Sequence, residues 1–281
     1  PVRRVLVRVA GQAGDARPLA RRCAGFCGYL RNYRTVREAI SSFRPDVLYV
    51  WAGAELTPAI LAACEESRLP LIFHLEDTWL LRAREQTGGT SSVSRLATRL
   101  KRSFAGMPQW ETCRWHAIYV SASLQKQYEE AGFSPGKAAV IHNGYDADTA
   151  PRDWPAGPPD VYTLGYVGRV RPNKGLAELL GALERCLAGG RQDLRLRIVG
   201  RGDPAYEAEL RARIRSTPLA ERVEWIGALP REKVLQAYRA FDLLVVPSQW
   251  EEPFGLVAIE AMGAGVPVLA TRRGGPAVLI A

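Results

Sequence analysis

Short apolar runs alternate along the chain with longer stretches in which apolar residues recur at helical spacing. The runs are rich in β-branched and aromatic residues and are bounded by proline, glycine or aspartate, which predicts strands. A first set covers residues 4–10, 46–52, 70–75, 117–121 and 139–143, and a second covers 162–168, 196–200, 223–227, 242–247 and 266–271. Strands that alternate with helices build parallel sheets, so the pattern predicts an α/β protein.

The two sets of strands are separated by a segment without periodicity. Residues 146–160 carry Pro151, Pro155, Pro158 and Pro159, a composition typical of a linker between domains. At 281 residues the chain is long enough for two compact units, each with its own core. We therefore predict domains at 1–154 and 155–281.

Both ends of the chain leave little room for further elements. About one β-α unit fits before the predicted strand at 46–52, and the chain stops soon after the strand at 266–271. A parallel sheet is covered by helices on its faces. We therefore expect the second domain to be truncated at its end.

Composition restricts the protein class further. Hydrophobic residues make up 47% and charged residues 24%, which is ordinary for a folded globular protein. The 5 cysteines have irregular spacings, so the sequence suggests neither a disulfide framework nor a zinc site. The apolar runs are too short for a transmembrane helix, and arginines interrupt the first of them, which argues against a signal peptide. A cytoplasmic location is expected, with the inner face of the membrane as a second possibility.

The net charge of +9 is compatible with several anionic partners. Basic residues neutralise phosphates of nucleic acids, membranes and nucleotides alike. They are scattered through both halves here, without a nucleic-acid-binding motif, and we expect no nucleic-acid partner.

The segment 251–271 carries the most specific chemical signal. Pro253 suits the first turn of a helix that ends near Gly263 and Gly265, with Leu256, Ile259 and Ala264 facing a core. Glu252 would then lie at the helix entrance and Glu260 roughly 12 Å further along the axis. Two carboxylates at this separation suit the two ends of a long ligand, with a phosphate at the helix start.

This segment resembles the acidic motif of the family-4 retaining glycosyltransferases, in which two glutamates are separated by seven residues. The resemblance implies the GT-B fold, with two Rossmann-like domains facing each other across a cleft. It implies that Glu252 and the backbone amides of Phe254 and Gly255 contact the transferred sugar, that Leu256 belongs to the donor site, and that Glu260 holds the ribose. The alternative is that Glu252 is an acidic residue favoured at a helix start and Glu260 a solvated helix charge.

A second element lies in residues 165–183, where a strand ends at Gly168 and is followed by Arg169 and by Lys174. A helix opens at Gly175, so two cations and free backbone N–H groups would lie together at a helix start. The resemblance extends to this element and implies that Gly168 belongs to the donor site and that Arg169 and Lys174 contact the donor diphosphate. On the alternative interpretation, both are solvated basic residues.

Weaker donor-side signals follow. Gly200 and Gly202 come directly after a strand and permit a tight turn, although this pattern alone is too short for a dinucleotide fingerprint. The resemblance places Gly200 beside the base and ribose, and Leu229 where the backbone contacts the base.

The predicted acceptor side of the site lies in the first half. His74 closes the strand at 70–75, and the resemblance implies that it lies near the donor sugar and the acceptor, with Asp77 as a neighbour. Asn143 lies in a turn that the family places at the cleft, although turn formation alone explains such a residue. The family's glycine-rich acceptor loop is shortened here, and Gly11 is the candidate remnant.

Residues 92–107 form a basic amphipathic pattern, with Val93, Leu96 and Leu100 on one helical face. Such a helix can lie on an anionic membrane. A helix packed on the core gives the same pattern, and we favour that interpretation.

The resemblance implies a retaining hexosyltransferase. Because Arg169, Lys174 and the helix-start amides would stabilise the leaving diphosphate, we expect neither a metal ion nor a cofactor. The enzyme would use a nucleoside-diphosphate sugar as donor and a glycan, lipid or small-molecule hydroxyl as acceptor. The alternative from another class is a non-catalytic subunit that binds a nucleotide sugar.

Overall fold

The computed structural model describes residues 18–51, 58–82, 115–145 and 157–280. The chain divides into two compact units, Pro1–Ile141 and His142–Ala281. The predicted boundary between residues 154 and 155 falls inside a part that is not described, 146–156, and it stays a prediction. The first predicted strand, 4–10, and the basic amphipathic segment 92–107 also lie outside the described residues, and membrane association stays a prediction.

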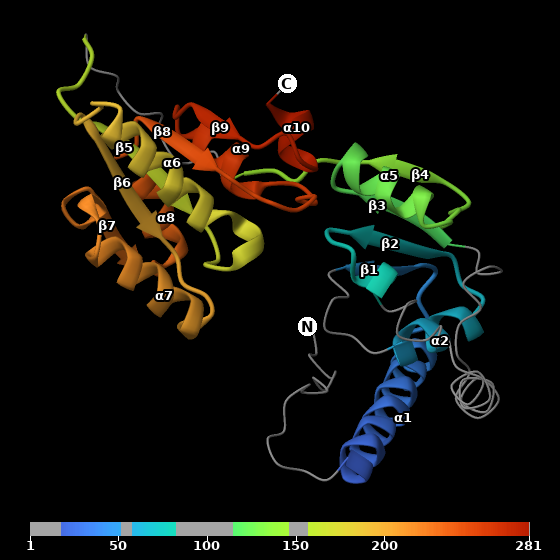
Figure 1. Ribbon diagram of the computed structural model, residues 1–281. Coiled ribbons are helices and arrows are strands. Elements are labelled where there is room, and N and C mark those ends of the chain that lie inside the picture. Colours follow the sequence, from blue (N-terminus) through green and yellow to red (C-terminus); the bar gives the residue numbers. More distant parts are fainter. Residues whose placement is uncertain (1–17, 52–57, 83–114, 146–156, 281) are drawn as a thin grey trace. The chain divides into compact units, whose positions relative to one another are not determined.

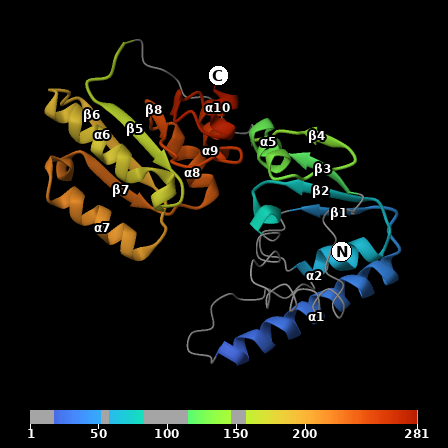
Figure 2. The ribbon, with the colours of Figure 1, turned by 45° about the vertical axis from the view of Figure 1, so that its right-hand side comes forward.

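The first unit is built on a parallel sheet with the order β1-β2-β3-β4 (Figure 1). Helices α1 and α2 run side by side in both views (Figure 2), and the Tyr33 hydroxyl donates a hydrogen bond to Glu66 between them. The Ser121 side chain accepts a hydrogen bond from the Leu124 amide and so caps α5. The elements are α1 (Pro18–Phe43), β1 (Leu48–Trp51), α2 (Pro58–Glu66), β2 (Leu71–Leu75), β3 (Trp115–Tyr119), α5 (Ala122–Glu130) and β4 (Ala138–Val140).

The inner strands of this sheet have alternate buried positions. Leu71, Phe73 and Leu75 of β2 are buried. Trp115 on β3 packs edge-on against Phe73, with ring centroids 5.3 Å apart. Alternating large apolar side chains on adjacent parallel strands therefore build the core that fixes the position of His74, the penultimate residue of β2.

The second unit has a parallel sheet with the order β7-β6-β5-β8-β9. This is a doubly wound arrangement: β6 and β7 are added on one side of β5, and the chain then returns to add β8 and β9 on the other side. Its elements are β5 (Tyr162–Val167), η2 (Pro172–Lys174), α6 (Leu176–Ala188), β6 (Leu194–Val199), α7 (Pro204–Arg215), η3 (Pro218–Glu221), β7 (Val223–Gly227), α8 (Arg231–Tyr238), β8 (Leu243–Val246), α9 (Leu256–Gly263), β9 (Val268–Ala270) and α10 (Gly275–Leu279).

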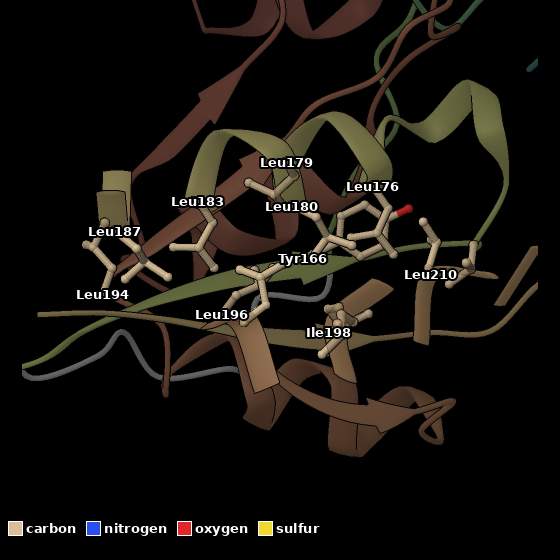
Figure 3. Close-up of a cluster of buried hydrophobic side chains, with 13 residues drawn as sticks. Tyr166, Leu176, Leu179, Leu180, Leu183, Leu187, Leu194, Leu196, Ile198 and Leu210 are labelled. Carbon is tan, nitrogen blue, oxygen red and sulfur yellow. The ribbon is translucent and has the colours of Figure 1, made fainter. Parts of the chain in front are cut away.

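The two faces of this sheet are covered by different helices. Leu164 and Tyr166 of β5 pack into a cluster with α6 and α7, whereas Val167 packs into a second cluster with α8 and α9. Figure 3 shows the leucines of α6 directed at Leu196 and Ile198 of β6. They recur at helical spacing, as Leu176, Leu179, Leu180, Leu183 and Leu187, so one apolar stripe is buried on the sheet.

All the predicted strands that fall within the described residues are present, within a few residues of their predicted bounds. The apolar pattern of β5 does not explain why residue 165 is a glycine, but the structure does. A Cβ atom at Gly165 would lie 2.2 Å from the ring of buried Phe241, so a glycine is needed in the middle of β5.

Candidate functional site

The predicted donor residues lie in the second unit, beyond the carboxyl ends of its strands. Lys174 ends the short 3-10 helix that follows β5, and Gly175 adopts a left-handed conformation, with φ 73°, before α6 begins. A Cβ atom at Gly175 would lie 1.8 Å from the Pro247 carbonyl oxygen. The start of α6 therefore lies directly against the segment that follows β8, which leads to Glu252.

Lys174 and Glu252 form an ion pair. The Lys174 ammonium lies 2.8 Å from Oε1 and 2.6 Å from Oε2 of Glu252. The two side chains are 23% and 14% exposed, so the pair is partly shielded from water. Lys174 and Glu252 are 78 residues apart in the sequence, and the fold brings their charged groups into contact.

Two further donors hold the same carboxylate. The Ser248 hydroxyl donates to Oε2 of Glu252 at 3.0 Å, and the Trp250 indole N–H donates to Oε2 at 2.9 Å. The Lys174 ammonium also lies 5.2 Å from the centroid of the Trp250 ring, within the range of a cation–π contact. Ser248 and Trp250 were not predicted, although both can donate hydrogen bonds and directly precede the acidic motif in sequence.

The prediction that Pro253 lies in the first turn of a helix is wrong. α9 begins at Leu256, after Gly255 in a left-handed conformation with φ 95°. Residues 251–255 form a loop because the Glu251 carboxylate accepts from the Gly274 amide at 2.7 Å and the Glu252 carbonyl accepts from the Gly275 amide at 2.6 Å. These partners are distant in sequence, so local pattern does not reveal them.

The predicted core face of α9 is also partly wrong. Leu256 is 46% exposed, whereas Ala258, Glu260 and Ala261 are buried. Ala261 and Ala264 pack into the cluster with α8 and β8. Ala264, directly after the helix, is buried as predicted.

Glu260 is 8% exposed, so it is a buried carboxylate rather than a solvated helix charge. The Tyr238 hydroxyl donates to its Oε2 at 2.8 Å, and the Arg231 guanidinium donates to its Oε1 at 3.2 Å. Burial, and then the adjacent Glu260, raise the pKa of Tyr238 far above its ordinary value, so its hydroxyl stays a donor. Tyr238 and Arg231 come from α8, and nothing in the sequence links them to Glu260.

The glycines after β5 and β6 approach each other closely. The Gly168 amide donates to the Val199 carbonyl at 3.0 Å, and a Cβ atom at Gly200 would lie 1.8 Å from the Gly168 carbonyl oxygen. The Gly200 amide donates to the Gly227 carbonyl at 2.7 Å. Gly200 is therefore required by this contact between strand ends, whatever its predicted role beside a nucleotide.

The remaining donor-side residues differ in exposure. Arg169 is exposed, and no ion pair holds it within the described part of the chain. Leu229 is half-buried against the cluster of α8 and α9. Phe254 is buried, and its ring centroid lies 5.7 Å from that of His142.

In the first unit, His74 is held by two aromatic residues of β1. Its Nδ1 lies 2.6 Å from the Tyr49 hydroxyl, and its ring stacks on Trp51 with centroids 5.8 Å apart. Nε2 of His74 is buried and has no hydrogen-bond partner among the described residues. The catalytic role of His74 stays a prediction.

The other predicted acceptor-side residues are Asp77, Asn143 and Gly11. The Asp77 carboxylate accepts from the Trp79 amide at 2.7 Å and from Arg82 at 3.3 Å, a local arrangement that caps the turn after β2. Asn143 is half-buried in an irregular segment after β4. Gly11 lies outside the described residues.

Two kinds of feature are absent from the described residues. No group of three or more metal-ligating side chains occurs in them. None of the helices seen there is both long and apolar enough to cross a membrane.

Two family models match the chain. Residues 7–149 match Glycosyltransferase Family 4, and residues 153–281 match Glycosyl transferases group 1. A D-inositol 3-phosphate glycosyltransferase of Catenulispora acidiphila is 35% identical over 163 residues, 53% of this chain and 38% of the relative. A glycogen synthase of Mycobacterium tuberculosis is 30% identical over 240 residues, 83% of this chain and 54% of the relative. The chain thus spans roughly half or less of the length of these relatives.

The fold is also similar to solved structures. The Anabaena protein HepE in complex with UDP-glucose aligns with a TM-score of 0.63 and 26% identity, over 94% of this chain and 68% of the other. A sucrose-phosphate synthase of Thermosynechococcus elongatus aligns with a TM-score of 0.64 and 20% identity, over 91% and 63%. Because the family-4 model alone matches 7–149 of the 281 residues, the chain belongs to the family-4 glycosyltransferases, and its two parallel sheets are those of the GT-B fold.

Proposed function

We propose that the protein is a retaining glycosyltransferase that moves a hexose from a nucleoside-diphosphate sugar to an acceptor hydroxyl, without a metal ion. One observation carries the proposal: Lys174 and Glu252, predicted from separate motifs to contact the diphosphate and the sugar of one donor, lie 2.6 Å apart. A diphosphate and the sugar attached to it are themselves adjacent. The adjacency of the pair therefore matches the adjacency of the two ligand groups that it is predicted to contact.

In the proposed reaction the bond between the anomeric carbon and the diphosphate oxygen breaks, and the acceptor oxygen bonds to that carbon. The diphosphate leaves with the bonding electron pair, and the acceptor hydroxyl releases its proton to water. Negative charge thus develops on the leaving group. Lys174, the exposed Arg169 and the backbone amides at the start of α6 are the groups that would stabilise this charge.

Glu252 would bind the sugar and Glu260 the ribose. A carboxylate whose donors leave lone pairs free can accept further hydrogen bonds from ligand hydroxyls. Each oxygen of Glu260 accepts one hydrogen bond from α8, from Tyr238 or from Arg231, so the carboxylate retains acceptor capacity. Anabaena HepE binds UDP-glucose in its crystal structure, and this similarity supports a nucleotide-sugar donor for the present chain.

The Lys174→Ala variant tests the proposal. We expect turnover to fall about 10²- to 10³-fold, because a charge-assisted contact made in the transition state is worth several kcal/mol. Transfer and donor hydrolysis would be measured with the glucose conjugates of UDP, GDP, ADP and TDP, after a thermal-shift screen for the one that binds. Circular dichroism would establish that the variant is folded, and unchanged turnover in a folded variant would reject the assignment.

The same measurements address the alternative of a non-catalytic nucleotide-sugar-binding subunit. Binding of a nucleotide sugar by the wild-type protein, with neither transfer nor slow hydrolysis of the donor, would favour that alternative. The joint presence of Arg169, Lys174, Glu252 and Glu260 favours the enzyme.

A further inference from the structure

Trp250 contacts both members of the ion pair. Its indole N–H donates to Oε2 of Glu252 at 2.9 Å, and its ring lies 5.2 Å from the Lys174 ammonium. Ser248, the other neutral donor to this carboxylate, contributes a hydroxyl and no ring. The indole therefore contacts the carboxylate through its N–H edge and the cation through its face.

The two oxygens of Glu252 are held unequally. Oε2 accepts from Lys174 at 2.6 Å, from Ser248 at 3.0 Å and from Trp250 at 2.9 Å. Oε1 accepts only from Lys174, at 2.8 Å, within the described residues. Since each carboxylate oxygen has about two acceptor positions, Oε2 is saturated and Oε1 retains capacity for one more donor.

We propose that Trp250 is a positioning residue that anchors Oε2 of Glu252, so that Oε1 is presented to a hydroxyl of the transferred sugar, while its ring places Lys174 for the diphosphate. This inference rests on the proposed function and deepens it. Ser248 assists at Oε2. Since the indole N–H and the indole ring have different partners, substitutions can separate the two effects.

The Trp250→Phe variant keeps an aromatic face for Lys174 and removes the N–H donor to Glu252. We expect it to bind the sugar conjugate about tenfold more weakly, since one charge-assisted hydrogen bond is lost, and to bind the nucleoside diphosphate as the wild type does. Trp250→Ala removes both contacts. It should weaken binding of the diphosphate as well.

Isothermal titration calorimetry with UDP, GDP, ADP and TDP and with their glucose conjugates measures both affinities. The matched control is Trp225→Phe, since the Trp225 indole N–H is buried without a partner among the described residues and its ring stacks under Arg211 at 4.1 Å. We expect this control to bind diphosphates and conjugates like the wild type. A general packing defect would lower both affinities together, whereas a positioning role lowers only that of the conjugate.

The outcomes distinguish a failure of the positioning role of Trp250 from a failure of the proposed function. If a wild-type conjugate binds and Trp250→Phe loses affinity for it selectively, the positioning role is supported. If Trp250→Phe binds the conjugate as the wild type does, or loses both ligands equally, the positioning role is overturned and the proposed function stands. If the wild-type protein binds none of these ligands, both are rejected.

Discussion

At the scale of single residues, the second unit places two carboxylates in different surroundings. Glu252 is held by a cation, a hydroxyl and an indole, whereas buried Glu260 is held by a tyrosine hydroxyl and an arginine. Arg231 is 61% exposed, so its ion pair contributes little to stability. The hydrogen bond from fully buried Tyr238 is the stronger constraint on Glu260.

The Tyr238→Phe variant is expected to lower the free energy of unfolding by about 1–3 kcal/mol, because it leaves a buried carboxylate oxygen without that donor. Affinity for the nucleoside diphosphate should fall as well, since Glu260 loses its orientation. Urea denaturation and calorimetry measure the two effects. Tyr206→Phe, on α7 and packed on the other cluster, is the matched control, and an equal loss in both variants would contradict the specific role of Tyr238.

At the scale of elements, glycines decide how closely the loops around the site approach each other. Gly175 lets the start of α6 meet the Pro247 carbonyl, and Gly200 lets the end of β6 meet the Gly168 carbonyl. The sequence identifies both as glycines between a strand and a helix. Which carbonyl each glycine meets depends on which strands are neighbours in the sheet. Only the order β7-β6-β5-β8-β9, seen in the structure, shows this.

The Gly175→Ala variant tests the close approach. Alanine at φ 73° costs about 1–2 kcal/mol from backbone conformation alone. The added Cβ would also lie 1.8 Å from the Pro247 carbonyl oxygen, which should cost roughly 1–3 kcal/mol more and displace Lys174.

Gly190→Ala is the control for this variant, because Gly190 has φ 93° and no atom lies within 4 Å of its added Cβ. Urea denaturation of both variants isolates the steric contribution. Equal destabilisation would show that the contact with Pro247 can relax without cost.

At the scale of the whole molecule, each unit has its own sheet and its own buried tyrosines. Burial raises the pKa of Tyr119 to about 12, and it also raises the pKa values of Tyr128, Tyr166 and Tyr238. Tyr119 and Tyr128 belong to the first unit and Tyr166 and Tyr238 to the second. The stability of both units should therefore depend on pH in the alkaline range.

The protein is expected to lose stability as pH rises above 10, the ordinary tyrosine pKa. Below that pH the tyrosines are protonated in the folded and unfolded states alike. Between 10.0 and about 12, unfolded chains lose the Tyr119 proton and folded ones keep it, so each such group lowers stability by about 1.4 kcal/mol per pH unit.

Urea denaturation between pH 8 and 11.5 measures this slope. Tyr119→Phe should reduce it, and stability at pH 8 should not fall, because the Tyr119 hydroxyl is buried without a partner among the described residues. An identical slope in the variant would contradict the assignment.

The alternation of apolar runs and helical stretches was sufficient to predict the α/β class and the strands of both described sheets, because each strand is a local pattern of buried positions. The acidic motif and the Gly168 to Lys174 segment were likewise sufficient to predict the family. Tertiary structure alone decided that Lys174 and Glu252 form an ion pair, that Ser248 and Trp250 hold its carboxylate, and that Tyr238 binds Glu260. It also decided that α9 starts at Leu256, since the preceding loop is held by Gly274 and Gly275. The physical reason is the same in each case: strand patterns are set by neighbouring residues, whereas these contacts join side chains and amides that only the strand order brings together.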